Sequence, residues 1–346
     1  MHDAGPLGPL FKPVLGPPAA ALYARAIARI NARYDRGVGV VTLDRTVISV
    51  GNLSVGGTGK TPLVAHIAHL LRDDGRTPCI AMRGYRSARA GSDEADAYRQ
   101  ALPDIALVVQ PDRAAGLAQL FATDQGRAID TVILDDGFQH RRIQRDLDLV
   151  LIDATRSPFQ DRLLPMGWLR EPPAALARAH AVVVTRADQI PVAALDRLSR
   201  QINEHHGQPL LALTRHAWRS IRSSRQSEPL HIDSIQGLRV LLVCAIANPP
   251  ALLAQAQQLG LDVADHLFLR DHDPFAARTI NRIAAAARRC SPDAILVTEK
   301  DWAKLKHVPD HRWPVPILLP ELAIEFITGG DAFNARIRDA SHRPTR

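Results

Sequence analysis

A glycine-rich loop, GNLSVGGTGKTP at residues 51–62, separates the apolar run Thr46–Val50 from the helical segment Pro62–Arg72. Glycines let successive backbone N–H groups point at phosphate oxygens, and the positive end of the following helix favours the same anion. We expect Lys60 to reach the β- and γ-phosphates of a nucleotide and the Thr61 hydroxyl to ligate Mg²⁺. A glycine-rich turn that binds nothing is the alternative. The predicted nucleotide-binding residues are Ser54, Val55, Gly56, Gly57, Thr58, Gly59, Lys60 and Thr61.

A second apolar run ends in two carboxylates. Residues 131–136 read TVILDD, so Asp135 and Asp136 follow four apolar residues. A phosphate loop needs an acidic partner for its metal ion at the end of a neighbouring strand, and oxygen ligands suit Mg²⁺. We therefore predict a metal site made by Thr61, Asp135 and Asp136. Asp135 is the preferred metal ligand, and Asp136 is placed to orient water or ligand.

Short apolar runs alternate with helical segments along the chain, which is typical of a parallel sheet covered on both faces. The pattern predicts an α/β fold, a P-loop NTPase-like and mostly parallel sheet covered by helices, with a second, smaller α/β domain. Strands are expected at residues 46–50, 79–82, 106–109, 131–134, 149–152, 181–184 and 210–213. The second domain is expected to hold strands at 240–245, 263–267, 294–297 and 315–318.

The 346 residues exceed what one hydrophobic core usually organises, so we expect two domains. A polar, irregular stretch marks the predicted junction. The expected divisions are an N-terminal extension with a helix at 1–36, a P-loop domain at 37–215, a linker at 216–238 and a smaller domain at 239–340 that closes over the site.

The N-terminal extension contains an amphipathic segment. Pro17 and Pro18 are expected to open a helix that runs to about Tyr34, because proline suits a first helical turn. One face carries Tyr23, Ile27, Ile30 and Tyr34, and a stripe of arginines lies beside it: Arg25, Arg29, Arg33 and Arg36. This pattern fits a helix that lies on a membrane surface and also an ordinary helix packed on its own domain.

Composition narrows the possible partners. The formal net charge of +7 is compatible with nucleic acid, anionic lipid or phosphorylated substrates, but no RNA-binding or zinc-finger signature occurs. We therefore predict no nucleic-acid partner, and no obligate protein partner is evident. The three cysteines form no CxxC pair, which indicates neither a disulfide framework nor a zinc site.

The phosphate loop and several later segments resemble the tetraacyldisaccharide 4′-kinase family, the lipid A 4′-kinases of Gram-negative bacteria. The matching motifs appear in order along almost the whole chain. They are GNLSVGGTGKTP, Arg83-Gly84-Tyr85, Asp93-Glu94, DDGFQH at 135–140, LPMGWLREP at 164–172, Asp271-His272 and Thr298-Glu299-Lys300-Asp301. The DDGxQH and LLPxGxLREP-like blocks are the most specific of these.

The resemblance implies transfer of the ATP γ-phosphate to the 4′-hydroxyl of tetraacyldisaccharide 1-phosphate, which gives lipid IVA. ATP and Mg²⁺ are the implied cofactors. The implied location is the cytoplasmic face of the inner membrane, with the N-terminal helix on anionic lipid. Asp93 is similar to the family's catalytic carboxylate, and His272 is similar to the partner that aligns it, so that the pair orients and deprotonates the sugar hydroxyl.

Other residues are expected to contact the substrate. Arg83 follows a strand end, where open α/β sheets bind ligands, although a plain surface arginine is the alternative. The predicted substrate-binding residues are Asn52, Arg83, Tyr85, Glu94, Gln139, His140 and Arg170. Arg170 and Glu171 could equally form a structural salt bridge. Thr298–Asp301, after a later strand, is a weaker candidate for a nucleotide contact.

Four positions depart from the expected patterns. The strict Walker A motif has glycine where Ser54 stands, and the two following glycines supply the flexibility instead. Met166 and Trp168 stand where smaller residues are expected, and Asp273 stands where a second histidine is frequent. The departure at Ser54 leaves the phosphate-binding chemistry in place, and the other three concern local substrate contacts and leave the predicted reaction unchanged.

Two other functions use the same phosphate loop. A P-loop ligase-like ATPase, of the kind found in biotin synthesis, would have no use for the amphipathic N-terminal helix. A nucleotide-switched protein that binds nucleic acid would hydrolyse nucleotide slowly and bind DNA or RNA in a salt-sensitive way.

Overall fold

The structure is a computed structural model that describes residues 12–84, 93–246, 248–270 and 273–342. The chain divides into two compact units. The P-loop unit comprises residues 1–88, 101–216 and 324–346, and the second unit comprises residues 89–100 and 217–323. Strands β7 (Ala212–Ser223) and β12 (Ile317–Thr328) each begin in one unit and end in the other.

The P-loop unit is built on a parallel sheet. Its strand order is β7-β6-β5-β1-β4-β2-β3. The strands are β1 (Thr46–Asn52), β2 (Pro78–Met82), β3 (Ala106–Val109), β4 (Thr131–Asp135), β5 (Leu147–Asp153) and β6 (Ala181–Thr185). Every residue of β1, β4, β5 and β6 is buried, as the continuous apolar runs predict for a sheet covered on both faces.

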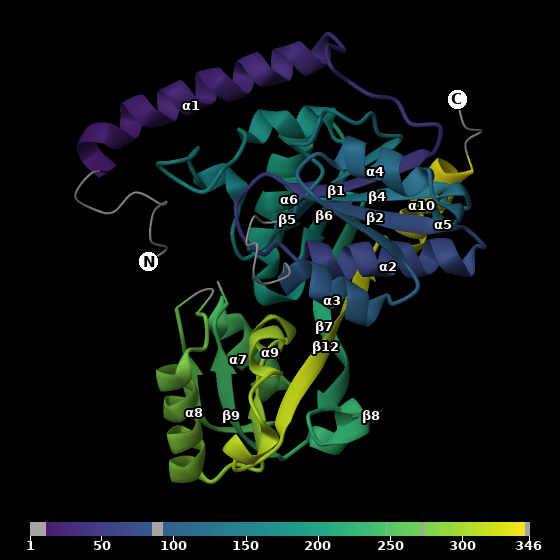
Figure 1. Cartoon of the computed structure of the whole chain (residues 1–346). Helices are drawn as coiled ribbons and strands as arrows, with labels where there is room; N and C mark the ends of the chain where they lie inside the picture. Colours follow the sequence, from purple (N-terminus) through teal and green to yellow (C-terminus); the bar gives the residue numbers. More distant parts are fainter. Residues whose placement is uncertain (1–11, 85–92, 247, 271–272, 343–346) are drawn as a thin grey trace. The chain divides into compact units, whose positions relative to one another are not determined.

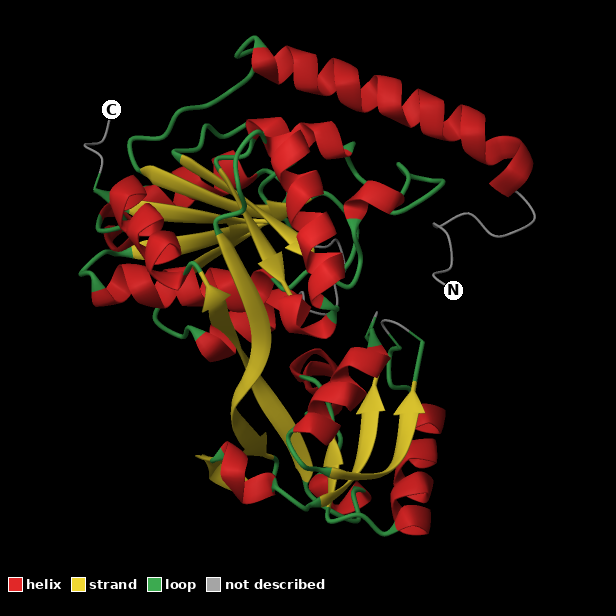
Figure 2. Cartoon of the chain, turned by 180° about the vertical axis from the view of Figure 1, so that it is seen from behind, coloured by secondary structure: helices red, strands yellow, loops and turns green. Residues whose placement is uncertain are grey.

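Helices cover both faces of this sheet (Figures 1 and 2). Helix α2 (Lys60–Asp73) packs on β1, β2 and β4, and α4 (Arg113–Phe121) packs on β2 and β3. Helix α6 (Val192–His206) packs on the 3-10 helix η2 (Pro173–Arg178). Three short helices of the unit are α5 (Asp124–Arg127), η1 (Pro158–Gln160) and η3 (Ala187–Gln189).

The second unit is a smaller α/β arrangement with the parallel strand order β10-β9-β11-β12. Its elements are α3 (Asp93–Ala101), β8 (Gln226–Leu230), η4 (Ile232–Ile235), β9 (Arg239–Cys244), α7 (Pro249–Gln258), β10 (Asp262–Phe268), α8 (Ala277–Cys290), β11 (Ala294–Leu296), α9 (Glu299–Leu305) and η5 (Asp310–Arg312). Thr298, a weak candidate for a nucleotide contact, caps α9 by accepting from the Asp301 N–H at 3.3 Å. Asp301 itself is fully buried and accepts from the Ala245 N–H at 3.3 Å, so this motif stabilises its own unit.

Three divisions of the chain differ from the predicted ones. Residues 89–100, predicted as part of the P-loop domain, belong to the second unit. The stretch 216–238 is not an irregular linker: it holds most of β7, antiparallel strand β8 and η4. The second unit ends at Ala323, whereas the predicted domain ran to residue 340. Helix α10 (Gly330–Ser341) instead packs on α2 and β1, because Phe333 and Ile337 bury their side chains there.

Helix α1 (Lys12–Asp35) begins earlier than predicted. Pro17 and Pro18 lie inside it rather than opening it, so the carbonyl groups four residues before each proline lack a helical N–H partner. The helix stands apart from those that cover the sheet (Figures 1 and 2). Among the described residues, no helix is both long enough and apolar enough to cross a membrane.

Candidate active site

The phosphate loop joins β1 to α2, as the sequence predicts. Gly59 precedes the helix with φ +84°, a left-handed conformation that favours glycine. Asn52, at the end of β1, is fully buried, and its side-chain amide donates to the Ser54 carbonyl at 2.8 Å. Its side-chain oxygen accepts from Lys60 Nζ at 3.2 Å. Asn52 therefore holds both the loop and the lysine of the loop.

The two predicted metal carboxylates lie beside this loop. Strands β1 and β4 are parallel neighbours, and their register pairs Val50 with Asp135. Asp135 is 3% exposed at the carboxyl end of β4. Asp136 follows with φ +53°, and this left-handed turn lets the next residue, Gly137, donate its N–H to the Val50 carbonyl at 3.0 Å. Asp135 and Asp136 thus stand beside the end of β1, where the phosphate loop begins.

Two cations bind the Asp136 carboxylate. Lys60 Nζ lies 3.4 Å from Oδ1, and Arg170 Nη1 lies 2.5 Å from Oδ2. Burial opposes ionisation of Asp136, but Lys60 and Arg170 outweigh it, and the pKa of this carboxyl falls to about 2. Asp136 is therefore an anion at neutral pH, and the predicted Arg170 belongs to the same charged cluster.

Gln139 and His140 also lie in this part of the structure. The Gln139 amide donates to the Asn52 carbonyl at 2.9 Å, and its oxygen accepts from Arg170 Nη1 at 3.3 Å. Burial and the nearby Arg113 and Arg145 lower the pKa of His140 to about 4, so its imidazole is neutral at pH 7. The structure thus brings both predicted residues next to the charged cluster.

Arg113 is a site residue that the sequence analysis missed. It is 2% exposed, and its Nη1 donates to the Asp136 carbonyl at 3.3 Å. Burial lowers the pKa of Arg113, and Asp136 and Asp135 partly restore it. A usable signal was present, because Arg113 begins α4, where the helix dipole disfavours a cation.

A short segment at residues 168–171, here called the strap, joins the loop to this cluster. The Val55 N–H donates to the Trp168 carbonyl, and the Arg170 N–H donates to the Leu53 carbonyl, both at 2.8 Å. Glu171, next in the strap, is 1% exposed and pairs with Arg178 at 2.7 Å. The sequence left open whether residues 170 and 171 contact the substrate or form a structural salt bridge. Glu171 forms a structural salt bridge with Arg178, whereas Arg170 faces the carboxylate of Asp136 in the site.

The far side of the phosphate loop is held by β6 and β7. The Thr185 hydroxyl donates to the Thr58 carbonyl at 2.9 Å, and Arg186 Nη1 donates to the Gly57 carbonyl at 3.2 Å. Arg186 also pairs with Asp153. A side chain at Gly59 would fall on the imidazole of His216, so this ring closes against the loop. The sequence analysis missed Thr185 and Arg186 because they end or follow an ordinary apolar strand, and it missed His216 because this residue lies in the polar stretch predicted as a linker.

Several predicted residues lie outside what the structure describes. Tyr85 and His272 fall outside the described residues, and Asp93 and Glu94 are described only as the first residues of α3. Arg83 follows β2 and is exposed. The proposed pairing of Asp93 with His272 therefore stays a prediction.

The donor set suits Mg²⁺ that is shared with phosphate. Thr61 brings a hydroxyl, and Asp135 and Asp136 bring carboxylates, all of them oxygen ligands. No group of three or more His, Cys, Asp or Glu side chains suited to hold a metal gathers among the described residues. A site with one or two carboxylates is usual where phosphates and water complete the magnesium shell.

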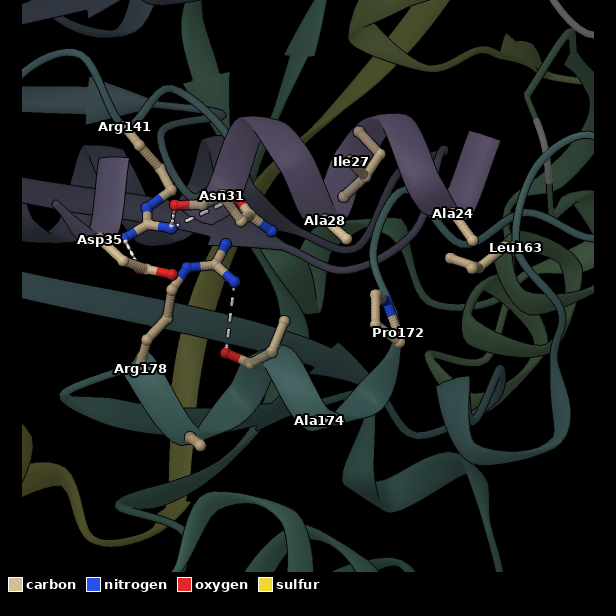
Figure 3. Close-up of a pocket in the computed structure, with 12 residues that line it drawn as sticks. Ala24, Ile27, Ala28, Asn31, Asp35, Arg141, Leu163, Pro172, Ala174 and Arg178 are labelled. Carbon is tan, nitrogen blue, oxygen red and sulfur yellow. Dashed lines mark hydrogen bonds and ion pairs between the residues drawn. The ribbon is translucent and has the colours of Figure 1, made fainter. Parts of the chain in front are cut away.

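Helix α1 contacts the strap. The Tyr23 hydroxyl donates to the Arg170 carbonyl at 2.9 Å, and the Asn31 amide donates to Glu171 Oε2 at 2.7 Å. Burial and the nearby Glu171 raise the pKa of Tyr23, which keeps this hydroxyl protonated. At the end of the helix, Arg141 pairs with Asp35 at 2.6 Å (Figure 3).

The predicted apolar stripe of α1 is therefore divided. Tyr23 and Ile27 face the P-loop unit, and Tyr34 is half-buried, whereas Ile30 is exposed. Between the helix and the unit lies a groove of about 460 Å³ (Figure 3). Its lining residues are Ala24, Ile27, Ala28, Asn31, Asp35, Arg141, Leu163, Pro172, Ala174, Ala175, Ala177 and Arg178.

Comparison with known proteins identifies the family. The family model described as tetraacyldisaccharide-1-P 4′-kinase matches residues 13–340. The chain is 35% identical over 302 residues to a tetraacyldisaccharide 4′-kinase of Geobacter metallireducens, covering 82% of this chain and 86% of the relative. A relative of the same name from Anaeromyxobacter dehalogenans is 34% identical over 320 residues, covering 87% of this chain and 83% of the relative.

A solved structure agrees with these relatives. The "apo" form of LpxK from Aquifex aeolicus, in complex with ATP, matches with a TM-score of 0.68 and 25% identity. The match covers 94% of this chain and 98% of that one, which confirms the predicted α/β P-loop fold. The chain belongs to the tetraacyldisaccharide-1-P 4′-kinase family.

Proposed function

We infer that the chain catalyses the reaction of its family, as a tetraacyldisaccharide 4′-kinase of lipid A biosynthesis. The ATP γ-phosphate goes to the 4′-hydroxyl of tetraacyldisaccharide 1-phosphate, and lipid IVA is the product. The observation that carries this proposal is the charged cluster of Lys60, Asp136 and Arg170 directly beside the phosphate loop. Such a cluster can hold a triphosphate and meet the charge that develops during transfer.

The phosphate loop is proposed to bind ATP, the ligand present in the related Aquifex aeolicus structure. Lys60 turns from Asn52 and Asp136 towards the β- and γ-phosphates, and the backbone N–H groups of residues 56–61 contact phosphate oxygens, since the Val55 N–H is bound to the Trp168 carbonyl. Thr61 and Asp135 or Asp136 would hold Mg²⁺, which would supply positive charge to neutralise the phosphates. Arg170 stays close to the transferred phosphoryl group.

Asp93 is proposed to accept the proton of the sugar hydroxyl, with His272 aligning its carboxylate. The motif positions that match the family support both assignments. Asp93 is the first residue of α3, which places it at a helix N-terminus. Arg83, Tyr85, Glu94, Gln139 and His140 are proposed to bind the sugar and its 1-phosphate; Arg83 and His140 supply the cation and the neutral donor.

Membrane docking is proposed for the outer face of α1. Leu22 is 70% exposed and Ile30 is 49% exposed, and both lie on the same side as the exposed Arg25, Arg29 and Arg33. An apolar edge among arginines fits the boundary between acyl chains and anionic headgroups. A substrate with four acyl chains stays in its bilayer, so the enzyme works at the membrane surface, on the cytoplasmic side of a Gram-negative inner membrane.

A phosphoryl-transfer assay tests the reaction. Full-length protein is incubated with γ-labelled ATP and tetraacyldisaccharide 1-phosphate in detergent micelles, and label on the lipid is measured. We expect transfer by the wild type, its loss in Lys60→Ala, and in Asp93→Asn a fall in kcat of about a hundredfold or more with little change in the Kd for ATP. Asp96→Asn, on the same helix, is the matched control.

Each negative result removes a defined part of the proposal. ATP hydrolysis without lipid labelling would favour a P-loop ATPase with another acceptor. Normal turnover by Asp93→Asn would remove the base assignment and leave the reaction itself in place.

A further inference from the structure

We propose that helix α1 has a role beyond membrane docking: through Tyr23 and Asn31 it positions Arg170 in the active site. Both residues contact the strap at residues 168–171, one through Arg170 and the other through Glu171. The strap is also the segment that pairs with the phosphate loop and presents Arg170 to Asp136. One short segment therefore connects the helix to the reacting groups.

The first connection is direct. Tyr23 donates to the backbone carbonyl of Arg170, the same residue whose guanidinium lies 2.5 Å from Asp136 Oδ2. The Arg170 N–H is fixed on the other side by the Leu53 carbonyl at 2.8 Å. The backbone of Arg170 is thus held between the phosphate loop and α1. Loss of the Tyr23 hydroxyl would free one side of it.

The second connection runs through a buried charge. The Asn31 amide donates to Glu171 Oε2, and Oε1 of the same carboxylate pairs with Arg178. Arg178 in turn donates to the Phe138 carbonyl at 3.1 Å, within the DDGFQH block, and its guanidinium lies 3.6 Å from the centre of the Phe138 ring. Because Glu171 is 1% exposed, its carboxylate depends on these donors for stability.

Part of the contact between α1 and the rest of the P-loop unit is open. The groove of about 460 Å³ lies beneath the helix, with Asn31 and the Arg141–Asp35 pair at one end (Figure 3). Polar contacts to the strap and to Arg141 therefore help to hold the helix in place. A change in the position of the helix would therefore reach the strap directly through Tyr23 and Asn31.

Tyr23→Phe tests the proposal with the smallest possible change. Full-length wild type and variant are assayed with ATP and tetraacyldisaccharide 1-phosphate in micelles, and kcat, KM and the Kd for ATP are measured separately. We expect kcat to fall about fivefold, the usual effect of one lost hydrogen bond, with the Kd for ATP unchanged. Binding to anionic vesicles should also be unchanged, which separates positioning from docking.

Tyr34→Phe is the matched control. It makes the same chemical change on the same helix, and within the described part of the chain the Tyr34 hydroxyl makes no hydrogen bond. Its kcat should equal that of the wild type. Equal kcat values for Tyr23→Phe and Tyr34→Phe would overturn the proposal.

A double-mutant cycle tests whether Tyr23 acts through Arg170. In an Arg170→Ala background the strap has no guanidinium to position, so Tyr23→Phe should cause no further loss of kcat. Additive losses would contradict the inference and indicate a general structural effect. Asn31→Ala provides a second, independent variant with the same expectations, and thermal unfolding midpoints verify that each variant is folded.

This inference rests on the proposed phosphoryl transfer, and the two can fail separately. A wild type that never labels the lipid would reject the proposed function. A wild type that labels it, with Tyr23→Phe and Asn31→Ala equally active, would reject only the positioning role of α1.

Discussion

At the scale of single residues, several basic side chains surround the one negative charge of Asp136. Its carboxylate is bound by Lys60 and Arg170, and the buried Arg113 donates to its backbone carbonyl. The pKa of about 2 lies below the ordinary aspartate value, so these pairs contribute stability that is complete above about pH 4 and is lost as the pH falls towards 2. Acid sensitivity in the normal working range must come from other groups.

Arg113 offers a sharp test of this cluster. Arg113→Met removes a guanidinium beside two carboxylates, and we expect kcat to fall about tenfold or more, because a hydrogen bond to a charged group is among the stronger ones. Arg113→Lys keeps the charge and should retain more activity. Arg127→Met, on exposed α5, makes the same change where no site is near. Steady-state kinetics in which Arg113→Met matches Arg127→Met would exclude a role for Arg113.

The site residues fall into two groups by how the sequence reveals them. Lys60, Asp135 and Asp136 stand in motifs whose spacing itself reflects the chemistry. Arg178 and Asn31 meet Glu171 only because distant segments fold together, and local pattern carries no trace of such contacts. Their importance depends on burial, which a single sequence does not report for charged residues.

At the scale of elements, the phosphate loop is fixed from both sides. The strap pairs with residues 53–55, and Thr185, Arg186 and His216 contact the loop from the ends of β6 and from β7. Such a loop is largely preformed before a nucleotide binds, so binding costs little conformational entropy of the loop.

Gly59→Ala should disturb this preformed loop. The residue has φ +84°, and an added Cβ would meet the His216 imidazole, so both backbone and packing oppose alanine. The left-handed backbone alone costs about 1–2 kcal/mol, and we expect ATP affinity to fall about tenfold or more by calorimetry. Gly207→Ala is the control, since this glycine, which caps α6 outside the phosphate loop, has a similar left-handed φ of +79° and nothing lies within 4 Å of its Cβ position. Similar affinities for the two variants would show that the loop yields easily.

The sequence predicts strands most accurately where both faces of the sheet are covered. The continuous apolar strands of the P-loop unit were found to within about two residues at each end. Strand β7 was predicted only at residues 210–213 because its later part alternates buried and exposed residues, with arginines and serines on the open side. A half-exposed strand of this kind resembles an irregular polar segment when no partner strand is known.

At the scale of the whole molecule, the net charge of the chain and the exposed apolar side chains of α1 suit the proposed anionic membrane surface. The net charge of +7 attracts the chain as a whole, and the outer face of α1 adds exposed leucine and isoleucine side chains. Neither feature alone binds a membrane firmly, since screening by salt weakens the first and the apolar area of the second is small.

Vesicle binding tests this combination. The double variant Leu22→Ser/Ile30→Ser should bind anionic vesicles about tenfold less tightly in a sedimentation assay, because two apolar side chains no longer enter the bilayer. Raising salt should weaken wild-type binding as well. Val192→Ser, which alters a side chain 74% exposed on α6, is the control. Undiminished binding by the double variant would place the docking surface elsewhere.

The return of the chain to the P-loop unit at residue 324 has a consequence for synthesis. A ribosome that has completed β7 must still translate more than a hundred residues before α10 can cover α2, which takes on the order of 10 s. During that interval the nascent nucleotide-binding unit lacks one of its helices, and apolar surface of α2 stays uncovered. Chaperones therefore have a defined window in which to act, and the packing of α10 on α2 closes it.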